Sequence, residues 1–171
     1  MKQTQKIWII FGLISIIFHI FLIFSGLVPN LVSRPMHMAL IIPWIFLYKS
    51  EKLSKNIISY LYVILGIFCC LWTSFNHELL GDQYGFLEGN VQTFISLSLL
   101  FIVLEMARRS VGWPLPFVSL LSLLYGMFGN LIPGEFGHPG IPINSYLGTL
   151  TIAEGGIWGT LTAVSVSIVA I

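Results

Sequence analysis

The stretch Ile7–Val28 reads IWIIFGLISIIFHIFLIFSGLV and holds 22 residues without a charged side chain. A helix of about 20 apolar residues crosses the roughly 30 Å hydrocarbon core of a bilayer. A secretory signal has an apolar region of only about 7–15 residues and then a small-residue cleavage site, whereas no A-x-A sequence follows Val28. We therefore expect a retained membrane-spanning helix that ends before Pro29 and Asn30.

The composition of the whole chain points to the same environment. Hydrophobic residues make up 56% of the 171 residues and charged residues only 9%, against about 25% charged in an ordinary soluble domain. Such a chain lacks the polar groups to cover a surface that faces water. Its formal net charge of +1 provides no basic field for nucleic acid. We expect an all-α, polytopic transmembrane helix bundle whose main partner is the lipid bilayer.

Further apolar stretches follow the first one. The five segments predicted to span the membrane are Ile7–Val28, Met36–Tyr48, Ile57–Phe75, Val91–Ala107 and Pro114–Ile132. A sixth stretch, Ile157–Ile171, would form a helix of only about 22 Å, which is less than a full crossing. It is either a partial, re-entrant segment or the end of a fragment of a longer protein, and we favour the fragment.

The positions of Lys and Arg predict the orientation. With the amino terminus in the cytoplasm and one crossing per segment, Arg34 is the one cation outside. The seven cations inside are Lys2, Lys6, Lys49, Lys52, Lys55, Arg108 and Arg109. An excess of cations marks the cytoplasmic side of membrane proteins, so we expect a multi-pass protein with a cytoplasmic amino terminus.

Two groups of charged residues lie at predicted helix ends. Glu105 is three and four residues before Arg108 and Arg109, spacings that place a carboxylate beside both guanidinium groups on a helix. We interpret this group as an interfacial anchor and clasp, with a contact to a neighbouring subunit as the alternative. Arg34 and His37 flank the expected external start of the second helix, with Pro35 in its first turn. We interpret them as a headgroup anchor; attraction of an anionic solute or an acidic partner is the alternative.

His19 lies in the middle of the first predicted span. An ionisable group at this depth is a candidate functional residue. With no second titratable group evident near it, we favour a neutral imidazole hydrogen-bonded within the bundle, for example to Ser15 one turn earlier.

The stretch Tyr125–Gly159 is rich in glycine and proline. Such residues at membrane depth interrupt helices, which is tolerated where the backbone lines a cavity or is buried by protein. Transporters bind substrates and ions at broken helices of this kind. Glu154 stands next to Gly155 and Gly156, where it is an ion ligand, a helix-cap partner or a loop charge. The spacing from Gly155 to Gly159 also fits a helix-packing motif.

Motifs of enzymes and metal sites are missing from the sequence. It contains no HExxH, no G-x-S-x-G and no P-loop, so neither hydrolase chemistry nor nucleotide-driven transport is indicated. Cys69 and Cys70 are adjacent, point apart on a helix and make no metal-binding spacing. We expect no enzyme activity, no metal site and no bound cofactor.

Four further motifs are RPMHMALIIPWIFL (34–47), LEMARRSVGWPLP (104–116), LYGMFGNLIPGEFGHPG (124–140) and IAEGGIWGTLTAVSVS (152–167). Together they resemble the fused permeases of the tripartite ATP-independent periplasmic (TRAP) transporter family. The similarity covers Arg34 to Ser167, and members of this family join a four-helix small permease domain to a large permease domain.

This resemblance implies a domain division and a function. Residues 1–110 would form the small-permease-like scaffold, and residues 111–171 the fifth helix, an external loop and the start of a hairpin of the large domain. The chain would take part in secondary transport of a small organic anion such as a dicarboxylate, across the inner membrane and coupled to a sodium or proton gradient.

The resemblance also implies partners and site residues. A periplasmic solute-binding protein would deliver the solute, and the remainder of the large permease domain would complete the site, because members of the family are several hundred residues long. The transport-region residues would be Glu154, Gly155, Gly156, Gly159 and Ser165. The alternative is a stand-alone accessory or scaffold protein that binds a partner permease without transporting by itself.

Overall fold

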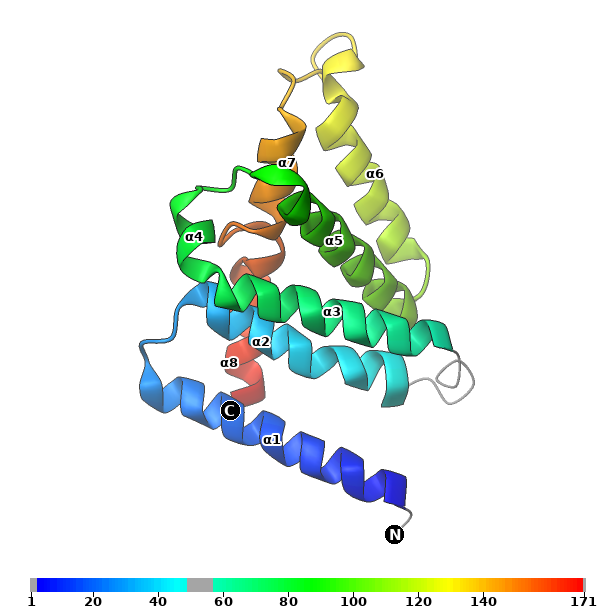
Figure 1. Cartoon of the computed structure of the whole chain (residues 1–171). Coiled ribbons are helices and arrows are strands. Elements are labelled where there is room, and N and C mark those ends of the chain that lie inside the picture. Colours follow the sequence, from blue (N-terminus) through cyan, green and yellow to red (C-terminus); the bar gives the residue numbers. More distant parts are fainter. Residues whose placement is uncertain (1–2, 49–56, 171) are drawn as a thin grey trace.

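The computed structural model describes residues 3–48 and 57–170, and each regular element in these two ranges is a helix (Figure 1). Lys2, Lys49, Lys52 and Lys55, which contribute to the predicted orientation, lie outside the described residues. The α-helices are α1 (Gln3–Ser25), α2 (Asn30–Pro43), α3 (Ile57–Phe75), α4 (His77–Asp82), α5 (Gly89–Val111), α6 (Pro114–Phe128), α7 (Ile143–Thr151) and α8 (Thr160–Ala170). A π-helical turn η1 (Trp44–Tyr48) and two 3₁₀ turns, η2 (Gly129–Leu131) and η3 (Gly156–Trp158), complete them.

Five helical stretches of the described residues are long and apolar enough to cross a membrane, which is the number predicted. They are Gln5–Ser25, Asn30–Tyr48, Ile57–Phe75, Gly89–Val111 and Pro114–Leu131. The third has the predicted bounds, and the first and fourth differ from the prediction by a few residues at their ends.

The second stretch differs most from its predicted bounds. Its helix α2 begins at Asn30, directly after Pro29, and therefore six residues before the expected start. Pro35 consequently lies inside α2 and not in its first turn, where it removes one backbone donor from the helix. The earlier start and the π turn η1 together give a 19-residue stretch, which is long enough to cross a membrane.

The sixth apolar stretch is interrupted. The turn η3 ends at Trp158, and Gly159 has an extended backbone (φ −76°, ψ −163°) before α8 begins at Thr160. The expected continuous segment from Ile157 is therefore a short turn followed by an 11-residue helix.

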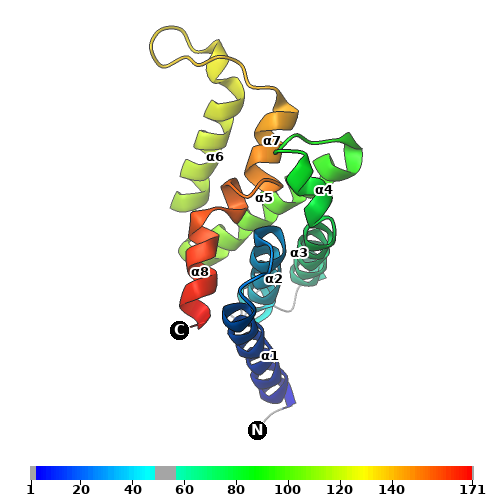
Figure 2. The ribbon, with the colours of Figure 1, turned by 90° about the vertical axis from the view of Figure 1, so that its left-hand side faces the viewer.

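Helices from both ends of the chain pack against one another. Helix α2 packs along α3, α5 lies against α3, α6 and α7, and α8 contacts α1 and α2. Figure 1 shows α1 at one edge of the molecule, and Figure 2 shows α8 running past α2 towards α1. Besides its contact with α8, α1 is held by edge-to-face and tilted contacts among the rings of Trp8, Phe11, Trp44 and Tyr48, whose centroids lie 4.9–6.1 Å apart.

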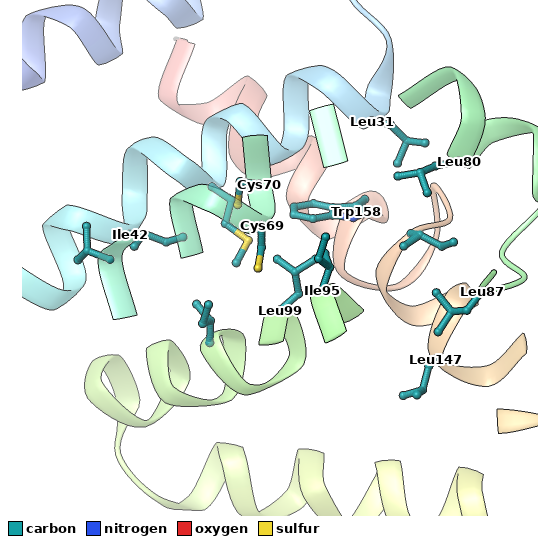
Figure 3. Packing of buried hydrophobic residues seen from close by; sticks show 14 of the residues in the cluster. Leu31, Ile42, Cys69, Cys70, Leu80, Leu87, Ile95, Leu99, Leu147 and Trp158 are labelled. Atoms are coloured by element: carbon teal, nitrogen blue, oxygen red, sulfur yellow. The ribbon is translucent and has the colours of Figure 1, made fainter. Parts of the chain in front are cut away.

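The core lies where α2, α3, α5 and α7 meet the turn η3. Figure 3 shows the Trp158 ring beside Cys69, Ile95 and Leu99, and all four side chains are fully buried. Cys70 is buried as well, and neither cysteine forms a disulfide. Both cysteines therefore act as small packing residues.

Large apolar side chains cover the outside of the helices. They occur along α1, α3, α5 and α6 and include Phe24, Ile64, Phe101 and Phe117, each more than half exposed. Soluble monomers rarely expose apolar patches larger than a few hundred Å². The outer surface of this molecule is therefore suited to lipid or to a protein partner.

The side chain of His138 contacts backbone carbonyl groups at the two sides of the loop between α6 and α7. Both ring nitrogens of His138 face carbonyl oxygens, Nδ1 that of Pro139 at 2.7 Å and Nε2 that of Tyr125 at 3.1 Å. Because these oxygens accept hydrogen bonds from a protonated ring, they raise the pKa of His138 above its usual value.

Helix α7 approaches the loop before α5 so closely that one glycine is required. A Cβ atom on Gly148 would collide with the backbone carbonyl oxygen of Gly85. A hydrogen bond from the Leu87 N–H to the carbonyl of Asn144 (3.3 Å) also joins this loop to α7.

We predict that Gly148→Ala destabilises the protein by about 1–3 kcal/mol, because backbone must move to admit the methyl group. Gly81→Ala is the matched control, since a Cβ at Gly81 meets open space. Thermal unfolding of both variants in detergent measures the difference. Equal melting temperatures for the two variants would contradict this packing.

Candidate functional site

The chain turns sharply between α7 and α8 at the glycines of the predicted transport region. Gly156 has a positive φ of 51°, a conformation that favours glycine. A Cβ atom on Gly156 would also collide with the backbone of Leu150. Both observations exclude a side chain at this position, so the interruption of the helix is built into the sequence at Gly156.

Trp158 fixes this turn to the core. Its side chain is 0% exposed, and its indole N–H donates to the carbonyl of Thr151 (2.6 Å). The hydroxyl of Thr151 lies 2.7 Å from both the carbonyl of Leu147 and the hydroxyl of Ser96 on α5. With a single hydrogen it donates to the carbonyl and accepts from Ser96, so every polar group of this buried contact is paired.

Arg34 and Asn30 of α2 hold the other side of the turn. The Arg34 guanidinium donates to the carbonyl of Glu154 (3.2 Å) and to the carbonyl of Trp158. The Asn30 side-chain amide donates to the Glu154 carboxylate (3.0 Å). Arg34 therefore ties α2 to the glycine-rich turn, a role that differs from the predicted headgroup anchor.

His19 and His37 form a buried pair, and this corrects two predictions. His37 is 1% exposed and does not face the headgroup region, and His19, also 1% exposed, has a second titratable group 2.6 Å away. The predicted bond of His19 to the carbonyl of Ser15 is present at 2.6 Å. On its other side, His37 Nε2 lies 3.0 Å from the hydroxyl of Ser165.

The predicted clasp at the end of α5 has the expected pairing. Arg108 binds both oxygens of Glu105 (2.6 and 2.7 Å), and Arg109 binds one of them (2.8 Å). Arg109 also donates to the hydroxyl of Ser59 on α3 (3.0 Å), and its guanidinium lies 4.6 Å from the ring centre of Phe46. The clasp therefore joins the end of α5 to α3 and η1.

Two open pockets flank the glycine-rich turn. One, of about 330 Å³, lies between the turn and α4 and includes Glu154, Leu80 and Tyr84 in its wall. The other, of about 210 Å³, lies between α1, α2 and α8 and includes Arg34 and Asn30. Among the described residues, no three His, Cys, Asp or Glu side chains converge as they would around a metal ion.

Several residues of this site are not evident from the sequence. Asn30, Ser96 and Thr151 are ordinary polar residues of helices, and their pairing depends on helices that lie far apart in the chain. Trp158 offers the one available signal, because a large aromatic residue between glycines needs a partner surface to bury its ring and N–H.

Comparisons with protein-family models, curated proteins and solved structures each return no match to the chain. The class of the protein therefore follows from its own structure. In the part of the chain that the structure describes, it is an all-helical protein with five helices long and apolar enough to cross a membrane.

We predict that Arg109→Ala lowers the free energy of unfolding by about 2 kcal/mol, because it removes a largely buried cation–π contact and the bond to Ser59. Arg108→Ala serves as the matched control and should cost about 1 kcal/mol or less, since the Arg108 side chain is 30% exposed and that of Arg109 only 9%. Chemical unfolding in detergent measures both. A larger loss for Arg108→Ala would show that the clasp does not act through Arg109.

Proposed function

We propose that the chain is a multi-pass protein of the inner (cytoplasmic) membrane with its amino terminus in the cytoplasm. Its five apolar helices and their exposed apolar faces support a bilayer environment. Arg108 and Arg109 lie at the end of α5, whereas the acidic Glu78, Asp82 and Glu88 precede its start. The 23-residue helix α5 is about 34 Å long, and these basic and acidic groups lie towards its opposite ends. By the positive-inside rule, we assign the arginines to the cytoplasmic side.

We predict that single cysteines introduced at opposite ends of α5 are labelled from opposite sides of the membrane. Tyr84→Cys precedes α5 and should react with an impermeant maleimide from the periplasmic side; Val111→Cys at its end should react after permeabilisation only. Both positions are exposed, and the native Cys69 and Cys70 are fully buried, so the unmodified chain is the control. Labelling of both sites from one side would contradict the proposed crossing.

We further propose that the chain is the amino-terminal part of a TRAP-type permease that takes up a small organic anion such as a dicarboxylate. Residues 1–110 would provide the scaffold and residues 111–171 the start of the large domain. The observation that carries this proposal is the glycine-rich break between α7 and α8, which a core tryptophan and Arg34 hold against the scaffold helices. A broken helix packed within a bundle offers backbone groups for solute and ions.

Glu154 provides a carboxylate group at this break. Its side chain is exposed at the edge of the 330 Å³ pocket, and Asn30 holds one carboxylate oxygen. A carboxylate with its second oxygen open is suited to a hydrated cation or a proton. In this proposal a sodium or proton gradient drives uptake, a periplasmic binding protein delivers the solute, and the remainder of the large permease domain completes the site.

A second candidate function is that of an accessory scaffold that binds a partner permease without transporting. The observation that favours it is the close packing of α7 and α8 on α5, α1 and α2. The turn η3 supplies Trp158 to the same core as these helices, so the described residues form one packed unit around the break.

We predict that Gly156→Val, introduced at the native chromosomal locus, lowers uptake of labelled succinate at least about tenfold, because a side chain at this turn displaces Glu154 and its partners. The membrane level of the protein is measured in parallel, and Gly81→Ala is the control. Uptake should also stop when a sodium ionophore or a protonophore collapses the driving gradient.

The outcomes separate the two candidate functions. Unchanged succinate uptake in Gly156→Val cells, with normal protein level, would overturn the proposed transport role. If uptake persists but a membrane partner no longer co-purifies with the variant, the result supports the accessory scaffold.

A further inference from the structure

A continuous row of hydrogen-bonding groups joins three helices in the interior of the molecule. It runs from the carbonyl of Ser15 to His19 on α1, then to His37 on α2 and to the hydroxyl of Ser165 on α8, with successive distances of 2.6, 2.6 and 3.0 Å. The Ser165 hydroxyl also lies 2.9 Å from the carbonyl of Thr162. Figure 2 shows these three helices meeting at one side of the bundle.

The carbonyl at one end fixes the first hydrogen of the row. A carbonyl only accepts, so Nδ1 of His19 carries a hydrogen and donates it to Ser15. Nε2 of His19 lies 2.6 Å from Nδ1 of His37, a separation that admits one hydrogen and excludes two opposed N–H groups. One hydrogen therefore always lies between the two rings.

With both rings neutral, the other end of the row has more acceptors than donors. His37 then donates from Nδ1 to His19, and its Nε2 is an acceptor for the Ser165 hydroxyl. The carbonyl of Thr162 competes for the same hydroxyl hydrogen. The neutral row therefore has one hydroxyl hydrogen for two acceptors; the Thr162 carbonyl also accepts the backbone N–H of its own helix, whereas Nε2 of His37 depends on the hydroxyl.

One added proton satisfies every group. Placed on Nε2 of His37, it is donated to the oxygen of Ser165, whose own hydrogen then turns to the carbonyl of Thr162. The His19–His37 pair now carries a single positive charge and shares the hydrogen between its rings. Charge-assisted hydrogen bonds of this kind are stronger than neutral ones.

We propose that the His19–His37 pair is a binding site for one proton, which is added at the Ser165 end and fastens α8 to α1 and α2. The site does not depend on the proposed transport role, because a scaffold protein with this row would bind the proton equally. Its two histidines lie on helices of the proposed scaffold, whereas Ser165 lies on α8 in the region 111–171.

The charged and titratable groups on the helices around the row are few. Phe18 places a ring against His19, with centroids 5.4 Å apart. Among the described residues, α8 and η3 carry no titratable side chain. The groups on the other elements packed against the row are Lys6 on α1, Arg34 on α2, Tyr48 on η1, Tyr60, Tyr62, Cys69 and Cys70 on α3, and His77, Glu78 and Asp82 on α4.

Arg34 is the cation nearest to the row in sequence, one turn before His37. Its guanidinium is directed to the carbonyls of Glu154 and Trp158. In the part of the chain that the structure describes, the partners of the pair are the carbonyl of Ser15 and the hydroxyl of Ser165, which would stabilise its positive charge.

The test is nitrogen NMR of the full chain, labelled with ¹⁵N-histidine and placed in lipid nanodiscs, across roughly pH 4 to 9, where histidine titrates. His77→Asn and His138→Asn variants assign the other two histidines. We expect a ¹⁵N–¹⁵N coupling between the His19 and His37 rings through their shared hydrogen, and uptake of one proton by the pair. Absence of the coupling, or uptake of either no proton or two protons by the pair within this range, overturns the proposal.

A pair of serine variants tests where the proton is added. Ser165→Ala removes the hydroxyl that accepts from His37, so the pair should bind its proton about tenfold more weakly, and the titration midpoint should fall by about one pH unit. Ser167→Ala is the matched control on the same helix, because its hydroxyl bonds to the carbonyl of Ala163 (3.1 Å) and, among the described residues, to no group of the row. Equal midpoints for the two variants would overturn the role of Ser165, and His19→Asn should abolish the coupling.

Discussion

The hydrogen bond from the Trp158 indole to the carbonyl of Thr151 is the contact on which the second half of the structure depends. An indole N–H buried without a partner costs several kcal/mol in apolar surroundings, so the ring is buried together with its acceptor. Thr151 is itself bound to α5 through Ser96. The turn η3 therefore stays closed against the core, and the direction of α8 follows from it.

Side-chain hydrogen bonds, and not apolar faces, determine which helices pack against one another. In the lipid environment that we propose, lipid tails compete equally for apolar side chains, so small residues and hydrogen bonds select the contacts. Arg34 joins α2 to the glycine-rich turn, Arg109 joins α5 to α3, and His37 joins α2 to α1 and α8. The ties made by Arg34, Arg109 and the His37–Ser165 contact connect segments that are distant in the sequence.

The glycine-rich turn and the histidine row meet at α8. Arg34 and His37 lie one turn apart on α2, the first bound to the residues before α8 and the second bound to Ser165 within it. A change in protonation at the row would therefore act on the same helix that begins at the broken segment. This shared helix links the proposed proton site to the proposed solute region without a direct contact between them.

The sequence by itself determined the helical class, the five long apolar segments and the Glu105 clasp, because hydropathy and helical spacing are local properties. It also indicated that helices are interrupted within the glycine-rich stretch Tyr125–Gly159, and the structure has one such interruption at Gly156, whose φ is positive. Only the tertiary structure decided that His37 is buried against His19 and that Arg34 binds the turn. Both depend on which faces of α1, α2 and α8 meet, and hydropathy cannot distinguish faces that are apolar all round. The predicted start of α2 was wrong because Pro35 fits the first turn of a helix by local rules. In the structure α2 begins at Asn30, and Pro35 is a buried residue inside it.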